Sequence, residues 1–81
     1  MNELIDNINK LHTTTLGEIR IKKNLKINSE NIVEYIKNLI KNKNNKIYKK
    51  GKNWYCETNE DIITINSYSY TIITAHKIRK Q

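Results

Sequence analysis

The sequence from residue 54 to residue 77 reads WYCETNEDIITINSYSYTIITAHK, and this stretch decides the fold. Apolar residues alternate in it with Thr, Tyr, Asn and His, the period of two that is typical of half-buried strands. Clusters of Asn, Ser and acidic residues interrupt the alternation twice, as turns do. We therefore expect three consecutive strands, over residues 54–58, 62–66 and 70–77.

A further strand is expected to begin at Ile47, just before this stretch. Residues 50–53 between the two strands contain Gly51, which adopts the positive φ of a tight hairpin turn without steric cost. Short connections of this kind join antiparallel neighbours. The C-terminal half, residues 46–78, is therefore predicted to form a four-stranded antiparallel meander.

The N-terminal half, residues 1–43, has the spacing of amphipathic helices instead. Three helices are expected, over residues 2–11, 14–25 and 29–42. In the second helix Leu16, Ile19 and Leu25 are predicted to form the apolar face, and Ile21 fits that face less well. The fold class is therefore α+β: a single domain with two to three N-terminal helices packed on one face of the sheet.

Length and composition exclude several classes of protein. A chain of 81 residues with one cysteine, Cys56, has no internal disulfide, and a zinc site is not expected because closely spaced ligand pairs are missing. No run approaches the roughly 20 apolar residues of a membrane span. The acidic, amphipathic start is unlike a signal peptide. We expect a cytoplasmic protein with no cofactor, no metal and no membrane association.

The net charge of +7 is concentrated in the second half. Residues 1–40 carry six basic against five acidic side chains, whereas residues 41–81 carry nine against three. A cationic sheet rich in Tyr and hydroxyl groups favours RNA or another polyanion as partner. A solvated basic surface that arises from a Lys- and Asn-rich composition is the competing interpretation.

Strand alternation predicts which side chains share a face. If Ile63, Ile65, Ile73 and Ala75 face the helices, then Thr64, Asn66, Thr74 and His76 lie on the opposite face. Tyr55 and Glu57 join them there if Trp54 and Cys56 point inward. The candidate nucleic-acid-binding residues are Lys46, Lys49, Lys50, Lys52, Tyr55, Asn66, Tyr68, Tyr70, Thr74 and Lys77.

A catalytic role would require a proton carrier and a cation for the phosphate. A histidine titrates near neutrality, so His76 is the candidate acid or base, with Lys52 holding phosphate and Glu57 as a second carboxyl partner. This set would make a metal-independent ribonuclease. The alternative is that His76 only ends a strand and that Glu57 pairs with a neighbouring lysine.

Three segments resemble a known family: Leu11-His12-Thr13-Thr14, Gly51-Lys52-Asn53-Trp54-Tyr55, and the stretch from Ile63 to Lys77. They are similar to short bacterial proteins grouped as domain of unknown function 3781, over almost the whole chain. That family implies no activity. The order of helices and strands also resembles RelE-like and colicin-type ribonuclease toxins, a resemblance that implies RNA cleavage on a sheet face.

Two other functions remain open. Residues 14–25 and 29–42 could form a helix-turn-helix of a winged DNA-binding regulator, whose second helix would present Asn31, Glu34, Tyr35 and Asn38 to a major groove. The chain could instead be a non-catalytic inhibitor, phage-borne or antitoxin-like, that binds one protein of a nucleic-acid machine. An open edge strand, 46–50 or 70–77, would also allow a homodimer.

Overall fold

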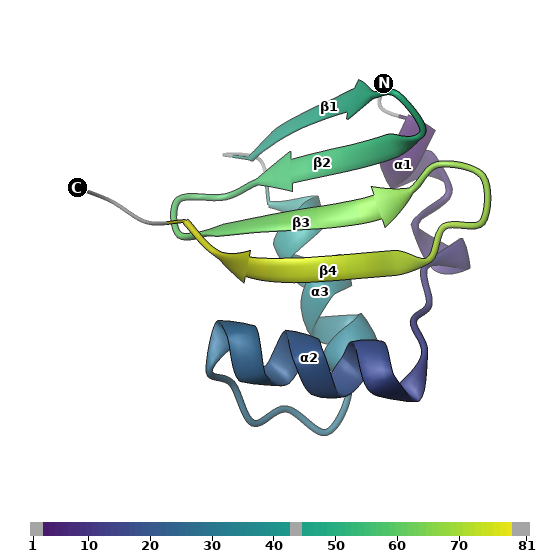
Figure 1. Cartoon of the computed structure of the whole chain (residues 1–81). Coiled ribbons are helices and arrows are strands. Elements are labelled where there is room, and N and C mark those ends of the chain that lie inside the picture. The colour runs from purple at the N-terminus through teal and green to yellow at the C-terminus, as the bar shows by residue number, and fades with distance from the viewer. Residues whose placement is uncertain (1–2, 43–44, 79–81) are drawn as a thin grey trace.

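The computed structural model describes residues 3–42 and 45–78, and within them helices precede strands, as predicted (Figure 1). The helical part consists of α1 (Glu3–Asp6), the short 3-10 helix η1 (Ile8–Lys10), α2 (Thr15–Leu25) and α3 (Ile32–Lys41). The strands are β1 (Lys46–Lys50), β2 (Asn53–Glu57), β3 (Asp61–Asn66) and β4 (Ile72–Lys77).

The sheet is an antiparallel meander with the strand order β1-β2-β3-β4. The β1–β2 turn contains Gly51 at φ 63°, which confirms the predicted hairpin glycine. Helix α3 lies behind the sheet and α2 runs beside β4, so the helices cover one face and one edge (Figure 1). The predicted α+β fold class is confirmed.

The core lies between the helices and the covered face of the sheet. Alternate strand residues enter it: Trp54 and Cys56 from β2, Ile63 and Ile65 from β3. Helix α3 contributes Ile32, Ile36 and Ile40 at helical spacing. This face of the sheet is therefore closed to ligands, and the opposite face, which we call the outer face, is the one left for a partner.

The apolar face predicted for the second helix is wrong at Leu16 and Ile19, whereas Leu25 is buried as predicted. Ile21 is fully buried, whereas Leu16 and Ile19 are 68% and 57% exposed. Ile21 and Leu25 are four residues apart and share one face of α2. Leu16 and Ile19 lie on the other side of the helix, away from the two buried residues of α2, Ile21 and Leu25.

The strand β4 departs from simple alternation. Thr64 pairs with Thr74, but Ile65 pairs with Ile72, so Ile73 is an extra residue in a β-bulge. Ile72 takes the core position and Ile73 is 45% exposed. The prediction that Ile73 faces the helices is therefore wrong, although those for Ile63, Ile65 and Ala75 are confirmed.

The first helix is interrupted earlier than predicted, and its continuation reaches the sheet. After η1, the chain runs extended from Leu11 and forms a parallel bridge between His12 and Thr71. Its backbone bonds are His12 N to Tyr70 O, 3.2 Å, and Ile72 N to His12 O, 2.7 Å. This arm covers the start of β4.

The third helix begins later than predicted, at Ile32. The predicted start was residue 29, but the N-cap is Asn31, whose side-chain oxygen accepts from Glu34 N at 3.1 Å. Lys43, the last residue of the predicted helical half, lies outside the described residues.

Candidate nucleic-acid interface

The outer face of the sheet is organised as rows of side chains that the register places opposite one another. The central row is Tyr48, Tyr55, Thr64 and Thr74. The row toward the C-terminal end of β4 is Lys46, Glu57, Ile62 and His76, and the row at the other end is Lys50, Asn53 and Asn66. The predicted grouping of Tyr55, Glu57, Thr64, Asn66, Thr74 and His76 on one face agrees with this register.

An aromatic pair dominates this face. The rings of Tyr48 and Tyr55 are stacked, with centroids 5.5 Å apart and planes 21° from parallel. The Lys46 ammonium lies 5.5 Å from the Tyr48 centroid. A hydrogen bond to the Glu57 carboxylate, followed by desolvation and the nearby charge, raises the pKa of the Tyr48 hydroxyl. Tyr48 is thus held in place from three sides.

Tyr48 is a site residue that was missed from the sequence. The signal was present, because Lys46, Tyr48 and Lys50 alternate in β1 in the same way as the polar residues of β3. That signal was too short to use, since β1 has only five residues and no apolar alternation to set its register.

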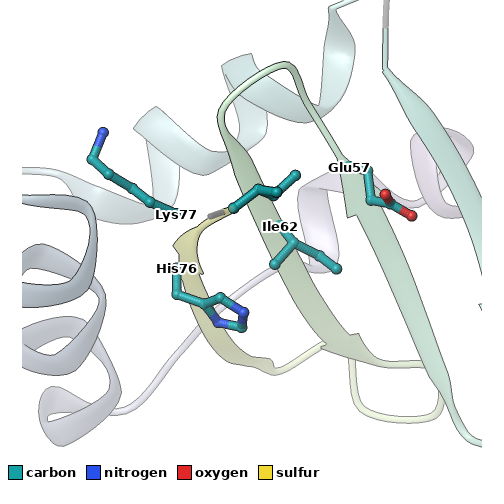
Figure 2. Close-up of a pocket in the computed structure, with 5 residues that line it drawn as sticks. Glu57, Ile62, His76 and Lys77 are labelled. Carbon is teal, nitrogen blue, oxygen red and sulfur yellow. The ribbon is translucent and has the colours of Figure 1, made fainter. Parts of the chain in front are cut away.

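A surface pocket of about 440 Å³ lies at one end of the outer face (Figure 2). Its lining residues are Glu57, Ile62, His76, Lys77 and Ile78. His76 is exposed, but Ile62 of β3 stands between it and Glu57 of β2. Neighbouring strands are about 4.8 Å apart, so the two residues are separated by about 10 Å across the sheet.

The predicted catalytic set is not assembled. Lys52 lies in the β1–β2 turn, next to Asn53, whereas Glu57 and His76 lie at the other end of the sheet. Asn53 and Glu57 are four steps apart along β2, which corresponds to about 13 Å at the usual rise per residue. The expectation that His76, Lys52 and Glu57 act together is corrected by this register.

Of the predicted binding residues, five lie on the outer face: Lys46, Lys50, Tyr55, Asn66 and Thr74. Lys52 and Tyr68 lie in turns and are exposed. The turn that carries Tyr68 is built on Asn66, whose Oδ1 accepts from the backbone N–H groups of Tyr68 and Ser69 at 2.9 and 3.0 Å.

Three predicted binding residues lie elsewhere. Tyr70 is buried, with the Lys10 ammonium 5.6 Å from its ring centroid, so it is not available to stack on a base. Lys49 points to the side of Trp54, 5.9 Å from that ring. Lys77 pairs in register with Asp61 and is one of the residues that line the pocket. Lys49 and Lys77 each stand next to an outer-face residue, Lys50 and His76, so strand alternation turns both lysines away from the outer face.

The residues proposed for a major-groove helix are largely committed to the fold. Asn31 caps α3, and Tyr35 packs against the core. Glu34 lies 3.9 Å from the Lys37 ammonium, and it is an acidic side chain on the face that would meet phosphates. These contacts disfavour the winged-helix interpretation. Of the two predicted edge strands, β4 is covered by α2 and the His12 arm, and β1 is the open one.

Fold and face together define a small α+β protein with an open, aromatic sheet surface. A family model described as a protein of unknown function, DUF3781, matches residues 5–76, so the chain belongs to this family, as its motifs indicated. No curated protein and no solved structure matches the chain. The resemblance to RelE-like and colicin-type ribonuclease toxins is therefore not supported.

Among the described residues, 3–42 and 45–78, no three His, Cys, Asp or Glu side chains come together as a metal site would require. None of their helices has the length and apolar character needed to cross a bilayer.

Proposed function

We propose that this protein binds single-stranded RNA on the outer face of its sheet. The observation that carries the proposal is the stacked Tyr48–Tyr55 pair on an uncovered sheet face, with lysines beside it. Aromatic side chains on an open sheet stack with unpaired bases, and this contact contributes about 1–3 kcal/mol per base. A reduced, buried Cys56 fits a cytoplasmic protein that would meet RNA there.

The positions of the lysines support a defined path for the bound RNA. Lys46 and Lys50 project from β1 on the outer face, and Lys52 follows in the turn. Phosphates would lie along β1, with bases directed toward β2. The single carboxylate in the neighbouring row, Glu57, already accepts the Tyr48 hydroxyl. Part of its negative charge is therefore satisfied within the protein.

The number of lysines sets the expected salt dependence. Three phosphate contacts to a single strand give a slope of about −2 in log affinity against log salt. Affinity should therefore fall about 20-fold between 50 and 200 mM salt. Because three contacts are few, we expect the stacking of bases on Tyr48 and Tyr55 to supply much of the affinity.

A matched pair of charge reversals tests the proposal. The variant Lys46→Glu/Lys50→Glu/Lys52→Glu should lose most of its affinity for a fluorescent uridine-rich RNA, measured by anisotropy. The control Arg20→Glu/Lys23→Glu/Lys26→Glu changes the net charge equally, at exposed positions on α2 and its C-cap. If both variants lose affinity equally, binding is non-specific and the outer face is not the site.

The tyrosines supply the second arm of the test. Tyr48→Thr/Tyr55→Thr keeps residues that favour strands and removes both rings. RNA affinity should fall by at least 10-fold while the salt slope stays near −2. An unchanged affinity would exclude stacking, and capture of a protein in place of RNA would favour the inhibitor interpretation.

A further inference from the structure

A polar network beside the outer face links the N-terminal arm of the chain to the connection between β3 and β4. It consists of His12 from the arm that follows η1, and Ser69 and Thr71 from the β3–β4 turn. The Thr71 Oγ1 lies 3.0 Å from His12 Nε2 and 2.8 Å from the Ser69 Oγ. The parallel bridge between His12 and Thr71 fixes this geometry through the backbone.

The tautomer of His12 follows from its other contact. Nδ1 lies 2.9 Å from the carbonyl oxygen of Lys10, which can only accept, so Nδ1 carries the proton. In the neutral imidazole Nε2 then carries a lone pair, which accepts a hydrogen bond from the Thr71 hydroxyl. Thr71 gives its proton to this bond, and its oxygen lies beside the Ser69 hydroxyl, which also donates to Asn66 Oδ1 at 3.3 Å.

The network therefore contains an alcohol, Thr71, a base within hydrogen-bond distance of it, His12, and a third group, the Lys10 carbonyl, that orients the base. That arrangement is the geometric signature of an activated hydroxyl nucleophile.

Backbone strain next to Thr71 is an independent observation. Tyr70 has φ 58°, the left-handed region that a bulky residue rarely adopts. The surrounding bonds hold it there: Tyr70 N donates to Asn66 O at 2.9 Å, and Asn66 N donates to Thr71 O at 2.9 Å. Strain of this kind costs about 1–3 kcal/mol and is concentrated at functional sites. Here it sets the direction in which Thr71 is presented.

We propose that Thr71 is a nucleophile and His12 its general base, in a site that acts on carboxylic esters. Thr71 Oγ1 forms a bond to the carbonyl carbon while its proton passes to His12 Nε2. The ester C–O bond breaks, the leaving oxygen takes the proton from His12, and Thr71 carries the acyl group. Water then attacks the acyl-threonine with His12 again accepting the proton, which yields the carboxylic acid and restores the Thr71 hydroxyl.

The neighbouring amides limit the rate. The backbone N–H groups of Tyr68 and Ser69 donate to Asn66 Oδ1, and that of Ile72 donates to His12 O. They do not point at a developing oxyanion, and one missing oxyanion donor lowers a rate by about 10² to 10³. Esters with good leaving groups are therefore the substrate class, and the acyl-threonine should accumulate.

The probe is p-nitrophenyl acetate, with the position of the acetyl group found by peptide mass spectrometry. The parent should be acetylated at Thr71 before Thr64 or Thr74, with an equal amount of p-nitrophenolate released. His12→Gln should slow acetylation of Thr71 by about 100-fold or more, the usual effect of losing a general base. The matched control His76→Gln should not change it.

Two further variants separate reactivity from folding. Thr71→Ser keeps the hydroxyl and should still be acetylated, whereas Thr71→Val should not be acetylated at residue 71 or release the corresponding p-nitrophenolate. The proposal is overturned if Thr71 of the parent reacts no faster than Thr64, or if folded His12→Gln, checked by circular dichroism, reacts like the parent. Neither His12 nor Thr71 takes part in the RNA-binding test, so the two proposals fail separately.

Discussion

Gly17 lies where the His12 arm turns into α2, and it tests how tightly that junction is packed. Its N–H donates to the Thr14 hydroxyl at 3.0 Å, and a Cβ at this position would overlap the Thr13 hydroxyl oxygen. That hydroxyl is held by the Ile72 carbonyl at 3.0 Å. Gly17 is therefore a contact glycine, although it has no unusual φ.

Gly17→Ala should consequently destabilise the protein by about 1–2 kcal/mol, as over-packing does. Helix propensity alone predicts the opposite sign, a gain of up to about 1 kcal/mol. In a Thr13→Ala background the overlap is removed, and the same substitution should become neutral or stabilising. Urea denaturation of the four proteins measures the coupling, and a stabilised single variant would contradict the packing.

Cys56 is fully buried beside Glu57, and burial, followed by the charge of Glu57, raises the pKa of its thiol to about 11. At neutral pH the thiol should react with Ellman's reagent only after unfolding, because the thiolate is the reactive form. Rapid labelling of the native protein would contradict this environment.

The same shift makes stability depend on alkaline pH. The folded pKa lies above the unfolded value of 9.0, so the unfolded chain loses the thiol proton first. The contribution of Cys56 is therefore complete below pH 9 and decreases as pH rises toward 11. The free energy of unfolding of the parent should fall more steeply over this range than that of Cys56→Ala, compared by urea denaturation.

At the scale of elements, α2 offers a clean test of helix orientation. Ile21→Ala should cost about 2–5 kcal/mol because it leaves a cavity between α2 and the sheet. Ile19→Ala, two residues away on the exposed face, should change stability by no more than about 0.5 kcal/mol. The two thermal midpoints decide the matter, and equal losses would mean that α2 is rotated relative to this structure.

The elements also show how far pattern alone reaches. The period of two located the three C-terminal strands and placed Thr64, Asn66, Thr74 and His76 together correctly. It failed at Ile73, since a bulge changes the alternation without changing composition. Helical spacing in turn failed to identify the buried face of α2, because Leu16 and Ile19 are as apolar as Ile21 and nothing local marks which face is covered.

The polar network depends on information of another kind. His12 and Thr71 are 59 residues apart, and only the packing of the arm against β4 brings them together. Each looks ordinary in the sequence, one beside a threonine run and the other in a turn. Tyr48 was missed for a similar reason, since it stacks on Tyr55 only after the β1–β2 register is known.

At the scale of the whole molecule, the two proposed sites lie in distinct places but share Asn66. Asn66 lies in the same outer-face row as Lys50 and Asn53. Its Oδ1 also accepts from the backbone N–H of Ser69 and so holds the turn that carries Ser69. The Ser67 N–H donates to the Lys52 carbonyl at 2.8 Å, which ties this turn to the lysine hairpin. RNA bound on the outer face would therefore end close to the proposed site around Thr71.

The order of the strands has one more consequence. In the described residues β1 pairs only with β2, so it is an edge strand. The free backbone groups of an edge strand can pair with the same strand of another copy and start a fibril. Three of the five residues of β1 are lysines, Lys46, Lys49 and Lys50, on both sides of the strand. The lysines of two such edge strands repel each other, so the same cations that would attract a polyanion also oppose aggregation at high concentration.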